Sequence, residues 1–466
     1  MKRLFITILT IITFINTGCK KFIDVNQDPN RPTDVQEALI LSPVELAISH
    51  SLHAGFAGIL AQHYTQTVAL NQPVPNEGTY LLTNAQTNDD WTNLYSRCLV
   101  NLDIIAKKAD ATGNIAYKGV SKILTALCIG VGTDYWGDLP YSEALSGIEN
   151  FKPKYDSQED IYNNIQSLLD EGLAALDQDS KKSPGDDDLF YGGDTDKWKK
   201  LAYALKARYY MHLTKAPGHT AAAQAVLALA ALDKGMAAND DDLKFSYDGS
   251  AGNENPWYLT FLPGSTLVLS SQLVDSLKSR KDPRLPKLVA PSSSTGLYTG
   301  RSIGLPSPAG DLAQYSIAAS FYGGASSANY LVNYTEGLFI KAEATFVTSG
   351  AAAAAPIYQA AIKAHMTKLG IDPESADAKT YLAARGSLTS ANAMQRMMEE
   401  KSIADFLNPE NWADWRRTGF PQLTKVQNAL SDIPRKLLYP QLETISNPQP
   451  QQSGQKITDR MWWDAQ

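Results

Sequence analysis

The stretch from Thr133 to Leu145, which reads TDYWGDLPYSEAL, constrains the fold most strongly, because a long helical pattern ends in it. Within residues 117–136, apolar side chains recur at helical spacing at Val120, Ile123, Leu124, Leu127 and Val131. Gly137 and Pro140 then stop the helix, as such residues do. The sequence therefore predicts a long buried helix that ends in a sharply defined turn.

Two carboxylates in this stretch, Asp134 and Asp138, are four residues apart, as a helical carboxylate pair would be. Catalysis by paired carboxylates needs a rigidly held separation, and Gly137 lies between these two where the helix is ending. We therefore interpret them as residues that fix the helix end and not as a catalytic dyad. Ser142 with Glu143 can open the next helical turn.

Helical spacing recurs along the rest of the chain. Apolar residues at three- and four-residue intervals predict helices at residues 35–40, 44–52, 91–105, 161–176, 198–209, 221–232, 334–347, 351–369 and 391–406, with Ser42-Pro43 separating the first two. The W-x-x-L openings at Trp91 and Trp198 resemble those of tetratricopeptide repeats, although the intervals are longer and less regular. The sequence predicts an all-α, mostly helical fold, a TPR-like bundle of helix hairpins.

The segment from Asn239 to Tyr334 has a different character, with scattered Gly, Pro, Ser and aromatic residues and one helical stripe at residues 267–277. Loops of this length in a compact protein usually carry function. Gly300–Gly304 matches the G-x-S-x-G motif of serine hydrolases. Because that motif needs a buried strand before it and a helix after it, and prolines flank it here, we interpret the match as accidental.

The N-terminus reads as a bacterial lipoprotein signal. Lys2-Arg3 precede an apolar run that is too short to span a bilayer, and the small pair Thr17-Gly18 precedes Cys19. We predict a signal peptide at residues 1–18, lipidation of Cys19, and one domain over residues 19–466. Cleavage at another site, giving a soluble periplasmic protein, is the alternative.

The net charge and the clusters of His, Asp and Cys side chains show which classes of function are disfavoured. A net charge of −7 argues against nucleic-acid binding. Two of the histidines at 50, 53 and 63 are three residues apart and could ligate a metal, but there is no H-E-x-x-H motif and no specified third ligand, so we interpret them as packing or surface groups. The acidic triplets at 186–188 and 240–242 could attract calcium, but they lack the alternating spacing of a liganding loop, so we interpret them as caps and turns. Cys98 and Cys128 read as buried thiols, although a disulfide between them is geometrically conceivable.

Near the C-terminus, Asn408–Pro421 reads NPENWADWRRTGFP. Two Trp three residues apart, followed by Arg416-Arg417, suggest rings and guanidinium groups packed against one another. A phosphate-binding role for the two arginines is the alternative, which an acidic lipoprotein disfavours.

Several ordered blocks together resemble one family. They are DPNRPT at 28–33, TDYWGDLPYSEAL at 133–145, NPENWADWRRTGFP at 408–421, PRKLLYP at 434–440 and WWD at 462–464. This series is similar to that of the SusD/RagB family of nutrient-binding outer-membrane lipoproteins of Bacteroidetes. Glu400–Ala404 departs from the family's pattern, in which Q-K-W-I-A is frequent. The resemblance covers residues 28–464.

The resemblance implies a surface-exposed, lipid-anchored outer-membrane protein that captures a glycan and delivers it to a TonB-dependent, SusC-like transporter. Relatives are not enzymes, and the resemblance implies no cofactor or metal. A peptide-binding, RagB-like lid of the same type of transporter is an alternative. Alternatives from other classes are a helical glycoside hydrolase and a purely structural lipoprotein scaffold.

We expect the ligand face in the irregular insertion at about residues 239–334, with the loop at residues 71–80 nearby. Helices at about residues 34–235 and 334–420 would form the TPR-like scaffold. Sugar rings stack on aromatic side chains, while Asn, Gln and Asp bond their hydroxyls. The candidate ligand-binding residues are Trp257, Tyr258, Tyr298, Tyr315, Tyr322 and Tyr330. The alternative is that most of these rings pack the insertion's own small core.

Overall fold

The computed structural model describes residues 35–263, 265–306 and 311–465. The predicted signal peptide and Cys19 lie outside the described residues. As predicted, the fold is mostly helical. The longer helices are α2 (Glu37–Ala47), α3 (Phe56–Tyr64), α5 (Val100–Thr112), α6 (Ile115–Trp136), α7 (Gln158–Leu176), α8 (Thr195–His212), α9 (Ala221–Leu232), α11 (Ser271–Ser279), α14 (Tyr334–Lys368), α15 (Ala376–Arg385), α16 (Ala393–Ala404) and α17 (Glu410–Thr418).

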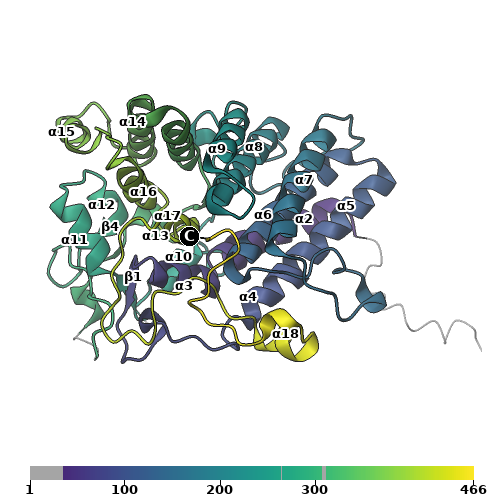
Figure 1. Ribbon diagram of the computed structural model, residues 1–466, viewed down its shortest axis with the longest axis horizontal. Coiled ribbons are helices and arrows are strands. Elements are labelled where there is room, and N and C mark those ends of the chain that lie inside the picture. The colour runs from purple at the N-terminus through teal and green to yellow at the C-terminus, as the bar shows by residue number, and fades with distance from the viewer. Residues whose placement is uncertain (1–34, 264, 307–310, 466) are drawn as a thin grey trace, which may run out of the picture.

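Successive helices pack as hairpins. α5 turns back into α6 at Gly113, which adopts a left-handed conformation with φ 80°, and α6 packs against α7 in turn. α8 and α9 form the next pair, and α9 lies against α14. Figure 1 shows these helices side by side, with α2, α5 and α7 at one end of the molecule and α11 and α15 at the other. The predicted helix-hairpin arrangement is therefore present.

Two helix boundaries differ from the sequence-based expectation. α2 continues through Pro43 and passes directly into a π-helix at Ile48–His53, so no break occurs at Ser42-Pro43. The next helix after α6 begins at Gln158 and not at Ser142. Asp156 explains the second difference, because its carboxylate accepts from the Ser142 backbone N–H at 2.6 Å and from the Ser142 hydroxyl, which holds a non-helical turn.

The segment between α9 and α14 is built around short two-stranded antiparallel sheets. β1 (Val68–Leu70) pairs with β3 (Leu267–Leu269), β2 (Leu243–Phe245) with β6 (Asn329–Val332), and β4 (Val289–Ala290) with β5 (Ile317–Ala318). The predicted helix at residues 267–277 therefore begins only at Ser271, because the first three residues form a strand. Since β1 precedes its partner β3 by about 200 residues and lies outside the insertion, this pairing joins the insertion to the helical scaffold.

The core is shared between scaffold and insertion. One large cluster fills the space between α2 and α8, and a second joins insertion residues such as Trp257, Leu277 and Tyr322 to Ile403 and Phe406 beside α16. Two helical stretches, residues 37–64 and 115–136, have the length and hydropathy of membrane spans. Their apolar windows are 67% and 72% buried inside the protein, which identifies them as core helices.

Candidate functional site

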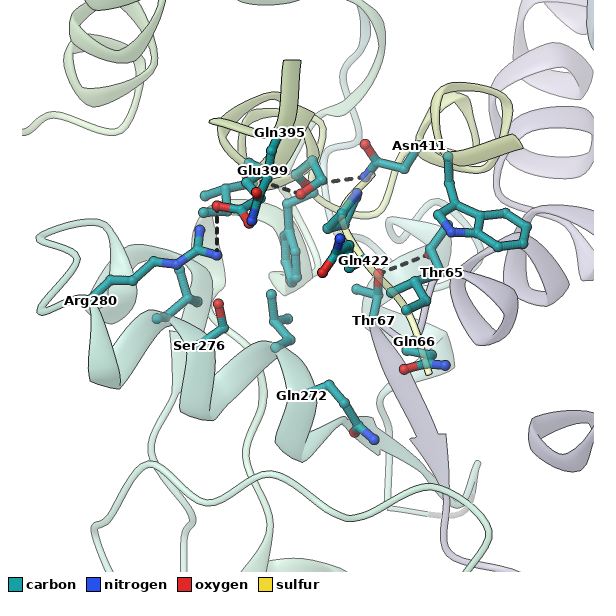
Figure 2. A pocket seen from close by; sticks show the side chains of 18 of the residues that line it. Thr65, Gln66, Thr67, Gln272, Ser276, Arg280, Gln395, Glu399, Asn411 and Gln422 are labelled. Atoms are coloured by element: carbon teal, nitrogen blue, oxygen red, sulfur yellow. Dashed lines mark hydrogen bonds and ion pairs between the residues drawn. The ribbon is translucent and has the colours of Figure 1, made fainter. Parts of the chain in front are cut away.

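A groove of about 440 Å³ lies where the insertion meets the scaffold. Five segments form it: the turn at residues 65–67, helix α11, helix α16, helix α17, and a segment at residues 421–424 (Figure 2). The β1–β3 pairing positions α11 beside the turn after α3. We call this hollow the groove.

The groove combines an apolar floor with a polar rim. Its apolar side chains are Leu273, Leu277, Ile403, Phe406, Trp415 and Leu423. Its amide and hydroxyl side chains are Thr65, Gln66, Thr67, Gln272, Ser276, Gln395, Ser402, Asn411, Gln422 and Thr424. This composition suits a ligand with both hydroxyl groups and apolar ring faces.

One ion pair crosses the groove wall. Arg280 lies 3.1 Å from Glu399, which accepts from Gln395 at 2.8 Å (Figure 2). Glu399 also binds Arg385 at 2.6 Å. Burial raises the pKa of Glu399, but the Gln395 hydrogen bond and the charges of Arg280 and Arg385 outweigh it and hold this pKa below its ordinary value. Glu399 therefore stays ionised at neutral pH, and its carboxylate is a hydrogen-bond acceptor held in place in the groove wall.

The six aromatic residues predicted to bind ligand do not line the groove. Trp257 is 1% exposed and Tyr322 is 5% exposed, and both pack in the cluster that joins the insertion to α16. Tyr322 contacts Tyr330 and Phe406 edge to face, with ring centroids 5.9 and 5.4 Å apart. Burial of these two rings favours the packing role that the sequence left open.

The other four candidates, Tyr258, Tyr298, Tyr315 and Tyr330, are partly exposed. The Tyr330 ring stacks on Phe321 at 5.8 Å, and the Lys368 ammonium lies 5.0 Å from its centre. Tyr315 lies under the Arg301 guanidinium at 5.6 Å. Ligand contact by these four residues stays a prediction.

The loop at residues 71–80 lies against the insertion, near where the sequence placed it. The Asn71 N–H donates to the Thr266 carbonyl at 2.8 Å, and Arg301 Nε donates to the Leu70 carbonyl at 2.9 Å. Asn428 from the C-terminal segment donates to the Gly304 carbonyl at 2.9 Å. The G-x-S-x-G match is thus part of an irregular contact between loops, without the strand and helix of a hydrolase motif.

Sequence reasoning missed the residues of the groove rim. One signal was available, because Gln272, Ser276 and Arg280 recur every four residues and form a polar stripe on the amphipathic α11. Nothing in the sequence pairs this stripe with residues 65–67 or 421–424. The stripe lies close to residues 65–67 because β1 pairs with β3, and close to residues 421–424 because of the path of the chain after α17.

The described residues bring together one group that could hold a metal ion, Asp134, His212 and Glu410. His212 Nε2 lies 2.6 Å from Glu410 Oε1, and Nδ1 lies 2.8 Å from the Tyr162 hydroxyl and 3.5 Å from Asp134. Burial lowers the pKa of His212, but the two carboxylates outweigh it and raise this pKa to about 9. An imidazolium cannot ligate a metal, so the group fits an internal ion pair better.

The Trp-Arg block packs as predicted. The Arg416 guanidinium lies 3.9 Å from the centre of the Trp412 ring and 4.9 Å from that of Trp463. Arg417 pairs with Glu343 and, at 2.8 Å, with Asp414. Both arginines are buried, which supports the packing role over phosphate binding.

The remaining side chains singled out from the sequence are structural. Cys98 and Cys128 are free, buried thiols. Asp188 accepts from the Tyr191 and Gly193 backbone N–H groups and from the Trp198 indole at 2.7 to 2.9 Å, as expected for a residue in a turn. Burial lowers the pKa of His53 to about 3 and that of His63 to about 4, so both pack as neutral rings.

Comparison with known proteins assigns the fold and the family. Residues 29–440 match the SusD-like family described as "Starch-binding associating with outer membrane". No curated protein matches the chain.

Solved structures resemble the whole fold. A protein described as chitin-binding is 26% identical, with a TM-score of 0.79, over 92% of this chain and 100% of that one. A SusD/RagB family protein from Bacteroides thetaiotaomicron is 24% identical with a TM-score of 0.78 (92% and 99% covered). A chitin-binding SusD homolog from Flavobacterium johnsoniae is 22% identical with a TM-score of 0.77 (92% and 98%). The chain therefore belongs to the SusD-like family.

Proposed function

We propose that this protein is a surface-exposed, outer-membrane lipoprotein that captures an oligosaccharide in the groove and delivers it to a TonB-dependent, SusC-like transporter. The observation that carries the proposal is the family match over residues 29–440, whose description includes both starch binding and association with the outer membrane. The lipobox ending at Cys19 supports a lipid anchor, and delivery to a transporter rests on the family resemblance.

The chemistry of the groove supports a saccharide ligand. Amide and hydroxyl groups on the rim can exchange hydrogen bonds with sugar hydroxyls, while the apolar floor can cover the C–H face of a ring. Glu399 is the single carboxylate among the described residues that line the groove. Glycoside hydrolysis by the usual mechanism needs two carboxylates across the scissile bond, so this lining favours binding over cleavage.

For the sugar, we propose an oligosaccharide of N-acetylhexosamine units. The relative described as chitin-binding covers nearly the whole chain at 26% identity, which supports this class of ligand. An N-acetyl group brings an amide, which can bond Gln side chains on the rim, and a methyl group, which can lie on the floor near Leu277 and Ile403.

Isothermal titration calorimetry with chitohexaose tests the proposal. We expect binding to the wild-type protein and a loss of about tenfold in affinity for the double variant Gln272→Ala, Gln422→Ala, because two hydrogen bonds of about 0.5 to 1.5 kcal/mol each are removed. Both side chains are exposed on the rim, so folding should be unaffected. Gln451→Ala, an exposed glutamine outside the groove lining, serves as the matched control.

Absence of binding to chitohexaose would reject the N-acetylhexosamine class, and maltohexaose then tests the starch-type alternative. An affinity that is unchanged in the double variant would place the ligand elsewhere, for example on the four partly exposed tyrosines. Release of new reducing ends from either glycan would contradict a purely binding role. Co-purification with a TonB-dependent barrel from native membranes tests the transporter partner.

A further inference from the structure

A second cavity, of about 430 Å³, lies between residues 425–435 and residues 458–460. Trp415 lines both hollows. The segment Pro421–Lys425, which we call the strap, contributes to both, since residues 421–424 line the groove and Lys425 lines the second cavity. The two hollows are therefore neighbours that share Trp415 and the strap.

The lining of the second cavity is basic. It contains Lys425, Arg435 and Arg460 with a single carboxylate, Asp432. Behind it, Asp464 binds Arg435 at 2.6 Å and Arg460 at 3.1 Å. Three cations thus face two carboxylates, in a protein whose net charge is −7. We call this hollow the basic cavity.

Two cations near the basic cavity, Lys215 and Arg416, are repelled by its arginines. Burial lowers the pKa of Lys215, and repulsion by Arg417, Arg460 and Arg435 lowers it further against the attraction of Asp464. Burial also lowers the pKa of Arg416 to about 10, and Arg435 adds to this effect against the attraction of Asp134 and Asp464. Repulsion from the arginines is thus a secondary cause in both groups, and a bound anion would relieve it.

The basic cavity also has free donors. Arg460 is 41% exposed on its side chain and uses only Nη1, toward Asp464, so Nε and Nη2 have no acceptor among the described residues. Lys425 is 52% exposed, and its one ion pair with a described residue is a 3.5 Å contact with the exposed Asp432. Exposed pairs of this kind contribute about 0 to 1 kcal/mol, so an incoming anion can replace them at little cost.

The strap is weakly held. In the described part of the chain, no backbone N–H of residues 422–425 finds an acceptor. Its principal polar link is Gln66 Nε2, which donates to the Thr424 carbonyl at 2.5 Å. A segment with so few hydrogen bonds can shift locally without unfolding the domain, which allows one ligand chain to pass from the groove into the basic cavity.

We propose that the basic cavity is a second subsite, which binds an anionic sugar residue of the same oligosaccharide whose neutral residues lie in the groove. The anion is a carboxylate or a sulfate ester, two oxyanions that sugars carry and that match the bidentate donors of arginine. The inference rests on the proposed function and narrows its substrate class from neutral glycans to glycans that contain both N-acetylhexosamine and an acidic residue.

Calorimetry with three hexasaccharides tests the subsite: neutral chitohexaose, hyaluronan hexasaccharide with carboxylates, and keratan sulfate hexasaccharide with sulfates alone. We expect at least one acidic glycan to bind about tenfold more tightly than chitohexaose at 50 mM NaCl, and the advantage to shrink at 300 mM as salt screens the charges. The double variant Lys425→Gln, Arg460→Gln should lose this advantage and keep its affinity for chitohexaose.

The matched control is Lys107→Gln, Lys154→Gln, which removes two exposed lysines outside both cavities. It should leave all affinities unchanged within about twofold. Equal binding of neutral and acidic glycans by the wild type would overturn the subsite and leave the proposed function standing. An equal loss in both double variants would overturn it too, by assigning the effect to net charge. If no glycan binds, the proposed function itself fails, and the subsite fails with it.

Discussion

At the scale of single residues, buried charges from three helices meet at one place in the core. Arg208 binds both carboxylate oxygens of Glu336 at 2.6 Å, and both side chains are almost fully buried. Glu410 lies 3.6 Å from Arg208 and also binds His212. A buried charge is tolerated only when it is paired and hydrogen-bonded. These residues therefore hold α8, α14 and α17 in one arrangement.

His212 makes this arrangement sensitive to pH. Its pKa in the folded protein, about 9, lies above the ordinary value of 6.5. Its contribution to stability is therefore fully present below pH 6.5 and is lost as the pH rises through 9. We expect urea unfolding to show a fall of about 3 kcal/mol in the free energy of unfolding over this range, from the size of the shift.

The variant His212→Gln isolates that contribution. It should be less stable than the wild type at pH 6.5, and the difference between the two proteins should shrink toward pH 9. Comparing differences removes the contributions of other titrating groups, such as Asp405, whose pKa burial raises to about 7. A difference that stays constant from pH 6.5 to 9 would contradict a charged His212 between Asp134 and Glu410.

Sequence reasoning was uneven at the scale of residues. It identified the Trp412–Arg417 block as a packed unit, because aromatic rings beside arginines have a characteristic chemistry. It also proposed Trp257 and Tyr322 for ligand contact, and both are buried. An aromatic ring in an irregular segment has the same sequence signal whether it faces solvent or fills a core. Only the tertiary structure separates these two cases.

At the scale of elements, close helix packing depends on small residues. A Cβ atom at Gly130 of α6 would lie 2.0 Å from the Tyr209 hydroxyl oxygen and 2.3 Å from Cζ of the same ring on α8. We expect Gly130→Ala to lower the free energy of unfolding by about 2 kcal/mol, since overpacking outweighs the gain in helix propensity. Urea unfolding at pH 7 measures the change.

Gly337 on α14 provides the matched control. A Cβ there would meet only Leu232 Cδ2 at 3.6 Å, which is an ordinary contact. Gly337→Ala should therefore stabilise the protein by up to about 1 kcal/mol through helix propensity alone. If both alanine variants are equally stabilising, α6 and α8 are not packed as closely as the structure indicates.

The helices could be predicted because their signal is local. Apolar residues at three- and four-residue intervals located α6, α7 and α8, and Gly350 correctly divided α14, where its φ of 82° interrupts the helix. The strands have two to four residues each and pair with partners far away in the sequence, so they have no local pattern to read. The groove was missed for the same reason, since the five segments that line it meet only after those strands pair.

At the scale of the whole molecule, the insertion depends on the scaffold. Its aromatic residues share a core with Ala54, Val68, Ile403 and Phe406, which come from segments before and after it. The groove lies along this junction, so the rigidity of the junction fixes the distance between α11 and α16. A ligand bridging these helices would therefore stabilise the entire fold by mass action.

The substitution Trp257→Ala tests whether scaffold and insertion unfold as one unit. Truncating this buried ring should lower the free energy of unfolding by about 3 to 5 kcal/mol. The control Leu297→Ala, at a side chain 65% exposed in the same insertion, should leave it almost unchanged.

Most helices lie outside the insertion, so far-UV circular dichroism reports chiefly on the scaffold. Because the core is shared, we expect the whole dichroism transition of Trp257→Ala to move to lower temperature in one step. A transition that keeps its midpoint after a small early loss would show that the insertion unfolds separately, and the groove would then have one mobile wall.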